Sequence, residues 1–402
     1  MNVYDVIIVG GGAAGFFVAS HLLSKKPKLK ILLLEKSRQI LQKVKISGGG
    51  RCNVTHACFE PRELIKFYPR GNQELLGPFH NFQPLDTIEW FESKNVKLKI
   101  EEDGRMFPVT DTSQTIIDCF LKASKNAEIR ISEGLADFEI ENQLYQIKTH
   151  QSTYYAKHVV LCCGSSKETW NLLSSKGISI IEPVPSLFTF RFLEPWKELS
   201  GISVLNVLLK IKDTNIQTQG NLLITHQGCS GPATLALSAW GARTLASLNY
   251  QLILQIDWTN QNISLDELHL FSKKHAQKGL HNACPIDLPH RLWKFLLYDY
   301  GKIKNAKWSQ LNEKDHLTIF EILTSCIIPI NGKNTFKEEF VTSGGVDLKF
   351  INFKTMEHKK FPNLYFAGEI LNIDAVTGGF NFQAAWTTGF LCAETIIKRL
   401  DN

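Results

Sequence analysis

The sequence predicts an α/β protein in which a domain built on a parallel sheet is interrupted by a second domain. Three observations predict this. A buried strand, a glycine-rich turn and a helix open the chain, patterns of another character fill residues 186–336, and the opening pattern returns afterwards. The 402 residues, 44% of them hydrophobic, suffice for two or three domains with their own cores. We therefore expect one domain from residues 1–185 and 337–402, with residues 186–336 inserted into it.

The first strand-helix-strand unit has the spacing of a dinucleotide-binding fold. YDVIIVG (residues 4–10) and KILLLEK (residues 30–36) are predicted to be buried strands on either side of a helix. The turn follows the pattern G-x-G-x-x-G, which lets the backbone approach a pyrophosphate at the helix N-terminus, and Glu35 is placed to accept ribose hydroxyls. The alternative is a tight structural turn. The expected binding residues are Gly10, Gly12, Ala13, Ala14, Gly15, Glu35 and Lys36.

The middle of the chain is less regular. Residues 84–95 have a helical pattern, and KHVVLCCGSS (residues 157–166) contains a buried strand. From residue 186 onward, short strand patterns come first, and helical patterns then fill much of residues 264–327. This change of character marks the inserted domain.

The last part of the chain favours FAD over a nicotinamide cofactor alone. A strand and a helix joined through glycines return in FAGEILNIDAVTGGFNFQ (residues 366–383), far from the first fingerprint. FAD is long enough to need both segments: the first would hold the pyrophosphate, and the second the ribityl chain and the ring, with helix-start N–H groups facing the negative edge of a reduced flavin. A strand-turn-helix with ordinary capping is the alternative. The expected residues are Gly368, Glu369, Gly378, Gly379, Phe380 and Asn381, with Cys163 and Gly164 contributing backbone.

A second glycine-rich stretch, KISGGGRCNVTH (residues 45–56), is predicted to lie beside the pyrophosphate and the flavin ring. Residues without Cβ atoms allow close approach to a flat ring. Arg51 would offset phosphate or reduced-flavin charge, and Asn53 would hydrogen-bond at the ring edge. The alternative is a glycine-rich connection with a surface arginine. The expected contacts are Ser47, Gly48, Gly49, Gly50, Arg51, Cys52 and Asn53.

The chain also contains DGRMFPVT, THQGCSGPATLALS and VTSGGVDL. In content and order, all these motifs resemble those of the conserved bacterial flavoproteins described as NAD(P)/FAD-dependent oxidoreductases, of the aminoacetone oxidase or bile-acid dehydro-reductase type. The resemblance runs nearly end to end. It implies a glutathione-reductase-like FAD domain interrupted by a β-barrel followed by helices. The chain departs from the family pattern at Ala375 and Val376, where Gly-Pro or a similar pair is usual, and this departure points to a different substrate preference.

The function expected from these features is that of an FAD-dependent oxidoreductase acting on a small-molecule substrate, with NAD(P)H as the electron donor. Only one dinucleotide fingerprint is present, so NAD(P)H would bind transiently without a Rossmann domain of its own. No acid, base or nucleophile stands out, and the catalytic residues are left unassigned. Two alternatives stay open: a flavoprotein that modifies tRNA, and a flavin-binding regulatory protein without catalysis.

Charge and cysteine usage shape the expected partners and location. The formal charge of +6 is small and the basic residues are scattered, so neither a nucleic acid nor a membrane is expected as a partner. The oligomeric state is left open. Nine cysteines, an odd number, and the absence of a signal peptide favour the reducing cytoplasm. No segment has the roughly 20 apolar residues that a membrane span requires.

Other reactive side chains carry weaker signals. Cys52 and Cys58 lack the spacing of a redox pair beside a flavin. A packing role for Cys52 and a loop thiol for Cys58 are therefore favoured over a dithiol. No metal site is expected, because the histidines form no ligand pattern. Ser230, before Gly231 and Pro232, either caps a helix or faces an anionic substrate. Arg105 either pairs with a neighbouring acid, which is the favoured role, or binds a carboxylate.

Overall fold

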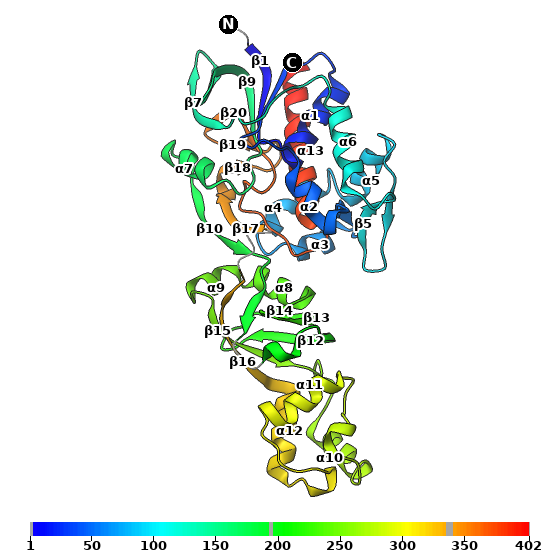
Figure 1. Cartoon of the computed structure of the whole chain (residues 1–402). Helices are drawn as coiled ribbons and strands as arrows, with labels where there is room; N and C mark the ends of the chain where they lie inside the picture. Colours follow the sequence, from blue (N-terminus) through cyan, green and yellow to red (C-terminus); the bar gives the residue numbers. More distant parts are fainter. Residues whose placement is uncertain (1–2, 193–195, 335–340, 402) are drawn as a thin grey trace. The chain divides into compact units, whose positions relative to one another are not determined.

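The computed structural model describes residues 3–192, 196–334 and 341–401. The chain divides into two compact units. The first consists of residues 1–183 and 341–402, and the second of residues 184–340. We call them the FAD unit and the inserted unit, and describe each by itself (Figure 1).

The FAD unit is built on a parallel sheet with the strand order β20-β9-β1-β2-β6. Its strands are β1 (Val3–Val9), β2 (Ile31–Leu34), β6 (Glu128–Arg130), β9 (Thr153–Leu161) and β20 (Phe361–Phe366). In register, Ile8 of β1 lies between Leu33 of β2 and Val160 of β9. All four residues of β2 are buried, as expected for an apolar strand covered on both faces.

Further strands extend this sheet, and others form two smaller sheets. The hairpin of β7 (Leu135–Glu141) and β8 (Leu144–Thr149) pairs with β9 through β8, and β19 (Glu357–His358) joins β18 (Ile351–Asn352) to β20. A second sheet has the order β3 (Thr55–His56), β5 (Arg105–Pro108), β4 (Leu98–Ile100). A third sheet pairs β10 (Ile180–Ser186) with β17 (Val341–Val346).

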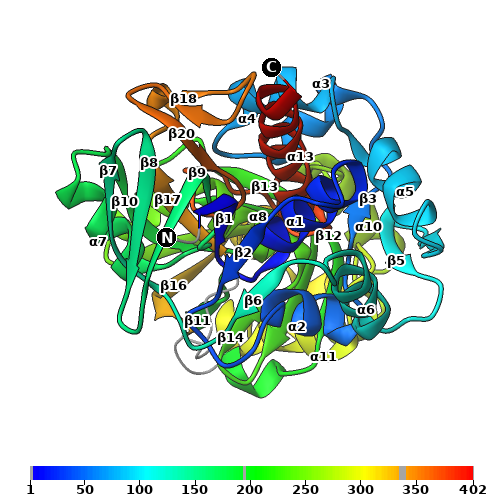
Figure 2. The same ribbon diagram turned by 90° about the horizontal axis from the view of Figure 1, so that it is seen from above.

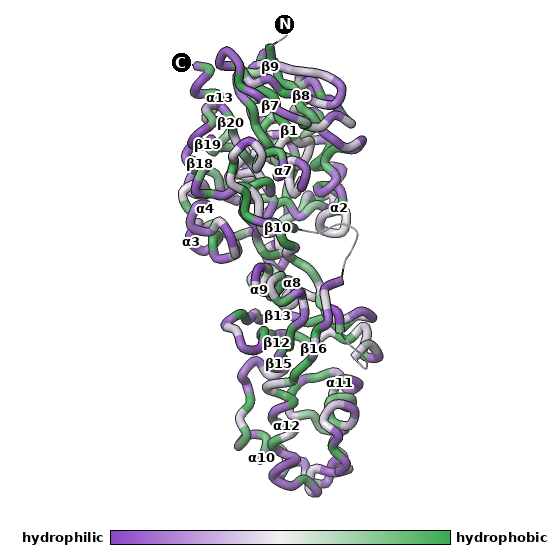
Figure 3. The backbone as a smooth tube through the Cα atoms, turned by 90° about the vertical axis from the view of Figure 1, so that its left-hand side faces the viewer, coloured by the Kyte–Doolittle hydropathy of each residue, from purple (hydrophilic) through white to green (hydrophobic). Residues whose placement is uncertain are grey.

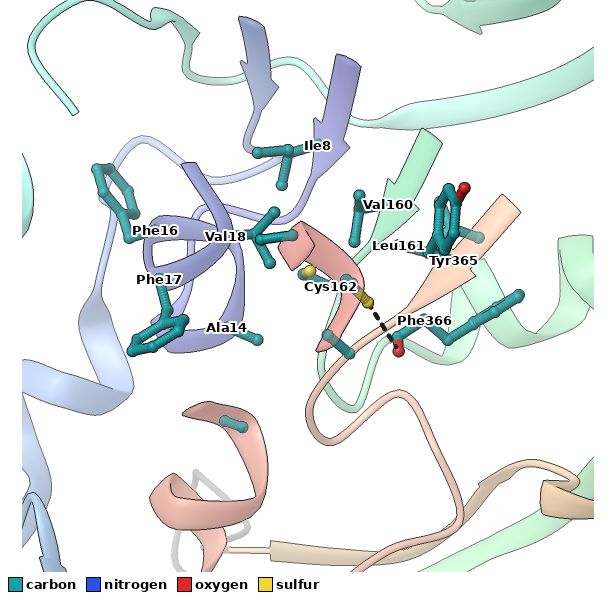
Figure 4. Close-up of a cluster of buried hydrophobic side chains, with 14 of the residues drawn as sticks. Ile8, Ala14, Phe16, Phe17, Val18, Val160, Leu161, Cys162, Tyr365 and Phe366 are labelled. Atoms are coloured by element: carbon teal, nitrogen blue, oxygen red, sulfur yellow. Dashed lines mark hydrogen bonds between the residues drawn. The ribbon is translucent and has the colours of Figure 1, made fainter. Parts of the chain in front are cut away.

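Two helices distant in sequence pack together against the parallel sheet. They are α1 (Ala13–Lys25) and α13 (Phe380–Asp401), which run side by side on one side of the sheet (Figure 2). A Cβ atom on Gly389 of α13 would lie 3.3 Å from Phe17 and 3.4 Å from Val18, so the absence of a side chain there keeps the helices close. Val18 of α1 points toward Ile8 of β1 and Val160 of β9, whereas the rings of Phe16 and Phe17 point to the opposite side of the helix (Figure 4). Phe16 packs against Phe120 and Phe17 against Trp90.

Shorter helices surround this core. They are α2 (Gln42–Gly50), α3 (Pro61–Leu64), η1 (Ile65–Phe67), α4 (Asn72–Phe79), α5 (Pro84–Glu92), α6 (Ser113–Ala123), α7 (Lys167–Ser175) and η6 (Leu348–Phe350). The predicted helix at residues 84–95 corresponds to α5, which Pro84 starts at a position where its missing N–H costs nothing.

The inserted unit begins with a closed six-stranded barrel of order β11-β14-β13-β12-β15-β16. The strands are β11 (Phe190–Phe192), β12 (Ser203–Ile211), β13 (Gln217–Thr225), β14 (Gly228–Ser230), β15 (Gln251–Asp257) and β16 (Cys326–Lys333). Helices η2 (Trp196–Leu199), α8 (Pro232–Trp240) and α9 (Ala242–Ser247) accompany the barrel strands.

A helical part lies between the last two barrel strands. It contains α10 (Leu265–Lys274), η3 (Leu280–Asn282), α11 (His290–Phe295), η4 (Leu296–Tyr300), η5 (Trp308–Gln310) and α12 (Glu313–Ser325). The buried side chains of Trp293 and Trp308 are in its core. The predicted fold class, a Rossmann-type domain with an inserted β-barrel and helices, is confirmed.

None of the helices in the described ranges is long and apolar enough to cross a membrane.

Candidate functional site

The first glycine loop is closed on one side and open on the other. A Cβ atom on Gly10 would lie 2.3 Å from the carbonyl oxygen of Cys162, and one on Gly15 would lie 2.0 Å from that of Gly10. Both glycines are therefore required by the packing of the chain itself. A Cβ atom on Gly12 meets no protein atom within 4 Å. The open space lies at the N-cap of α1, ahead of Ala13 and Ala14, where unpaired N–H groups attract an anion.

Glu35 links the end of β2 to this loop. Its Oε2 accepts a hydrogen bond from the Gly11 N–H at 2.7 Å, and its Oε1 accepts one from the Ser37 N–H at 2.8 Å. A carboxylate has about four acceptor positions, so two remain for ribose hydroxyls. The predicted contact of Lys36 with the cofactor stays a prediction. The Nζ of Lys36 forms an ion pair with Glu168 at 3.0 Å. This ion pair lowers the pKa of Glu168 to about 2.

The triple glycine forms a left-handed turn at the end of α2. Ser47 has extended backbone angles, and Gly48 and Gly49 then have φ of 57° and 68°. A Cβ atom on Gly48 would lie 2.8 Å from the Phe107 ring, whereas Cβ atoms on Gly49 and Gly50 meet nothing within 4 Å. The loop therefore has a packed side and an open side, and the open side has the form of a cradle for a ligand.

Asn53 joins this turn to the start of α13. With its amide oriented to satisfy both ends, Asn53 accepts from the Gly379 N–H at 3.0 Å and donates to the Thr55 carbonyl at 3.0 Å. A Cβ atom on Gly379 would lie 2.6 Å from that same carbonyl oxygen. Trp386 of α13 also donates to the Val54 carbonyl at 2.9 Å. The two predicted segments are thus in direct contact.

Arg51 is occupied by neighbours within the chain. It donates to Glu101 at 2.5 Å and to Asp111 at 3.5 Å, and its guanidinium stacks 3.9 Å from the Phe107 ring centroid. Hydrogen bonding to Glu101 raises its pKa. The two carboxylates offset its charge, so the predicted role of Arg51 toward a phosphate or a reduced flavin stays a prediction.

The ends of β9 and β20 approach the first loop. A Cβ atom on Gly368 would lie 3.0 Å from the Cβ of Ala14, and one on Gly164 would lie 3.7 Å from Oε2 of Glu369. Glu369 forms an ion pair with Lys43 of α2 and accepts from the Thr342 N–H at 3.1 Å. The predicted residues from three distant parts of the sequence therefore surround one region of the FAD unit.

The turn into α13 is held by side chains on both sides. Asn381 accepts from the Ala375 N–H at 3.0 Å and donates to the Ala375 carbonyl at 3.1 Å. The ring of Phe380 stacks on His56 at 4.6 Å and on Phe67 at 4.3 Å between centroids. These contacts fix Gly378 and the first turn of the helix beside the triple-glycine segment.

The thiols near this region are protonated, because burial, complete for Cys52 and partial for the others, raises their pKa. Burial raises the pKa of Cys52 and of Cys163 to about 12, and it raises the pKa of Cys58 as well. A protonated buried thiol is a poor nucleophile. Cys52 and Cys58 are free in the structure. The expected roles, packing for Cys52 and a loop thiol for Cys58, stay predictions.

Sequence reasoning missed a buried ion pair that holds the loop before α13. Arg70 donates from Nε to Asp374 at 2.5 Å, and the Asp374 side chain is fully buried. No local signal identifies this pair, because 304 positions separate its members. His56 was also missed. Its Nε2 lies 3.1 Å from the Asp103 carbonyl oxygen, and burial lowers its pKa.

Among the described residues, one group has the side chains and spacing to hold a metal ion: His269, Glu313 and His316, whose ligand atoms lie within 4.8 Å of one another. The group belongs to the inserted unit. Both ring nitrogens of His316 already have partners, the Asn312 carbonyl at 2.9 Å and the Ser272 hydroxyl at 2.9 Å.

The family comparison decides the identity of this architecture. A model of the HI0933-like protein Rossmann domain matches residues 4–395. The chain belongs to the HI0933-like family. The predicted membership of an FAD-dependent oxidoreductase family is confirmed, and with it FAD as the cofactor of the fold.

Curated relatives align with this HI0933-like protein from end to end. Ribosomal RNA dihydrouridine synthase of Escherichia coli (strain K12) is 28% identical and 99% of each chain is covered. The protein of the same name from Haemophilus influenzae is 26% identical with 98% of each chain covered. A 3-dehydro-bile acid delta(4,6)-reductase from Clostridium scindens is 22% identical, again with 98% of each chain covered.

Solved structures share the fold. A flavocytochrome c3 fumarate reductase has a TM-score of 0.53 at 15% identity, covering 100% of this chain and 79% of its own. The quinol fumarate reductase of E. coli has a TM-score of 0.52 at 13% identity, covering 100% of this chain and 71% of its own. At these identities the likeness concerns the fold alone.

Two predictions from the sequence are wrong by these comparisons. The small-molecule substrate and the exclusion of nucleic acid conflict with the two relatives named for ribosomal RNA, and the RNA-modifying alternative fits better. The physical reason is that a net charge averages over the chain. Residues 270–310 hold eight Lys and Arg but only two Asp and Glu, and the remaining residues hold 37 of each kind.

Proposed function

We propose that this HI0933-like protein is an FAD-dependent enzyme that reduces uridine in ribosomal RNA to dihydrouridine. The observation that carries the proposal is the end-to-end similarity to ribosomal RNA dihydrouridine synthase, at 28% identity over 99% of both chains. The bile-acid relative supports the reaction class, since it is also named as a reductase. Reduction of a carbon-carbon double bond is the chemistry that a flavin carries.

The FAD unit has the features needed to hold the cofactor. The open faces of Gly12 and of Gly49 and Gly50 are spaces that a Cβ would enter and that no protein atom occupies within 4 Å. Glu35 retains acceptor positions for the ribose after its two backbone hydrogen bonds. We assign the pyrophosphate to the N-terminus of α1, and the ring to the region between the triple glycine and the start of α13.

The protein supplies binding and orientation in this proposal. With NAD(P)H as electron donor, bound FAD would supply the hydride that adds to the C5=C6 bond of uracil, and a proton completes the addition. The stacked rings of His56, Phe67 and Phe380 hold the start of α13 in place beside the triple glycine. The buried Arg70–Asp374 pair fixes the loop that precedes this helix.

The test is formation of dihydrouridine by the purified yellow protein. Ribosomal RNA transcribed in vitro, and therefore unmodified, is incubated with the protein, FAD and NADH or NADPH. The RNA is then digested to nucleosides, which are separated by chromatography and whose masses are measured by mass spectrometry. We expect a uridine derivative that is heavier by two hydrogens.

A variant that folds without its cofactor is the control. Gly12→Ala adds one methyl group to the open face of the first loop, so its fold should remain while FAD and dihydrouridine are lost. The proposal is overturned if NAD(P)H bleaches the flavin of the parent protein but neither unmodified ribosomal RNA nor isolated ribosomal subunits gain dihydrouridine.

A further inference from the structure

The positive charge of this protein is concentrated in one part of the inserted unit. Residues 270–310 have a formal charge of +6, which equals the formal charge of the whole chain. All eight basic side chains of this segment are exposed. They are Lys273, Lys274, Lys278, Arg291, Lys294, Lys302, Lys304 and Lys307.

The fold brings two of these basic stretches together. Gly279 and Lys307 form an antiparallel bridge, and the Trp308 N–H donates to the Lys278 carbonyl at 3.2 Å. The Leu280 N–H donates to the Ala306 carbonyl at 3.0 Å. The loop after α10 therefore runs beside the loop that carries Lys302 to Lys307. Figure 3 shows hydrophilic stretches around α10 in this part of the inserted unit.

The neighbouring acids do not neutralise these side chains. Within the described residues, none of the eight basic side chains forms an ion pair. Acids of the helical part are used instead at helix starts: Glu267 caps α10 with Ser264, and Asp315 caps α12 with Asn312. Lys273 and Lys274 lie at the C-terminus of α10, where the helix dipole favours a positive charge. This effect on the helix explains two of the eight basic residues without any bound RNA.

The tryptophans of this segment are not available to bases. Both tryptophans of the segment, Trp293 and Trp308, are only 1% exposed, so neither offers a stacking platform for a base. Exposed lysines without aromatic partners bind the phosphate backbone and read no sequence.

We propose that residues 273–307 form an RNA-docking surface that binds phosphates of a ribosomal RNA substrate without base readout. This inference rests on the proposed function, because it names the surface that gives the RNA affinity while the chemistry belongs to the FAD unit. Such binding weakens steeply with salt as counterions return to the RNA.

Two variants with the same change in net charge test the surface. The first replaces Lys274, Lys278, Lys302 and Lys304 by Gln, at positions on the proposed surface. The second replaces Lys25, Lys28, Lys122 and Lys125 by Gln, which are exposed lysines of the FAD unit. Each protein is titrated with ribosomal RNA transcribed in vitro, at several salt concentrations, and flavin absorbance verifies that FAD is retained.

We expect the first variant to bind RNA at least about tenfold more weakly than the parent. The slope of the logarithm of the binding constant against the logarithm of the salt concentration should be smaller in magnitude by about 1 for each phosphate that the variant no longer neutralises. The second variant should bind like the parent. Equal affinity of the two variants overturns the docking surface. If the parent protein still forms dihydrouridine, the proposed function survives this result. A parent with neither RNA affinity nor dihydrouridine formation overturns both.

Discussion

The two units of this protein handle charge and backbone in opposite ways. In the FAD unit, charged side chains near the site are paired, such as Arg51 with Glu101 and Lys43 with Glu369, and the open surfaces are those of glycine backbone. In the helical part of the inserted unit, eight basic side chains are exposed without an ion pair among the described residues. A cofactor site formed by glycine backbone can be recognised from a sequence motif. A basic surface can be recognised only from the local content of Lys and Arg.

The largest expected effect separates two glycines of the same loop. Gly15→Ala places a Cβ atom 2.0 Å from the Gly10 carbonyl oxygen, so we expect a loss of about 3 kcal/mol or more of unfolding free energy. Gly12→Ala meets open space and should keep the fold while weakening FAD binding at least about tenfold, or about 1.4 kcal/mol.

Urea unfolding followed by circular dichroism, beside flavin titration, measures both quantities. Tight FAD binding by Gly12→Ala would show that the open face does not receive the pyrophosphate.

Acid should destabilise the FAD unit more than the inserted unit. The histidines that the structure describes as buried, His21, His158 and His358, belong to the FAD unit, and burial lowers the pKa of each. For His158 the pKa falls from 6.5 to about 4 in the folded protein. The stability that the neutral ring contributes is therefore complete above pH 6.5 and is lost as the pH falls toward 4. This amounts to about 3 kcal/mol.

His158→Phe cannot take up this proton, so its unfolding free energy should depend less on pH in the same window. Denaturant titrations at a series of pH values from neutral to about 4 compare the variant with the parent. Identical pH dependence would mean that His158 is hydrated in the native state.

Glu35→Gln should reduce FAD affinity by about 1.5 to 3 kcal/mol, because a neutral amide replaces a charged acceptor of ribose hydroxyls. The change keeps the size of the side chain, and the amide oxygen still accepts from the Gly11 N–H. Fluorescence titration of the apoprotein with FAD gives the affinity. Lys157→Gln is the control, since Lys157 pairs with Asp5 outside the predicted site and its loss should leave FAD affinity unchanged.

The smallest effect compares two exposed glycines with left-handed backbone, one in each unit. Gly49 has φ of 68° and Gly201 has φ of 88°, and neither would bring a Cβ atom within 4 Å of another part of the protein. Replacing either by Ala should cost about 1 to 2 kcal/mol of stability.

Only Gly49→Ala should also reduce flavin retention, and Gly49→Val should abolish it. Flavin absorbance after gel filtration and thermal unfolding of the same samples separate the two effects. Parallel behaviour of the Gly49 and Gly201 variants would make the triple glycine a structural connection.

Much of the FAD unit was predictable because its signals are local. The pattern of Gly10, Gly12 and Gly15 between two apolar strands specifies a strand-turn-helix by sterics alone. The left-handed turn at Gly48 and Gly49 follows from the same freedom of the backbone. The sequence could not predict which carboxylates neutralise Arg51, because Glu101 and Asp111 approach it only after β5 and its neighbours have paired.

By itself the sequence determined the cofactor class, the interrupted domain and the family, because glycine spacing and strand periodicity act over a few residues. Only the tertiary structure decided which surfaces remain open. It closes Gly15 against Gly10 and leaves Gly12 free, and it joins Asn53 to Gly379 across the unit. It also pairs the chain at Gly279 with Lys307, so that basic residues of two loops share one region. Contacts between residues far apart in the chain depend on packing, which no local pattern encodes.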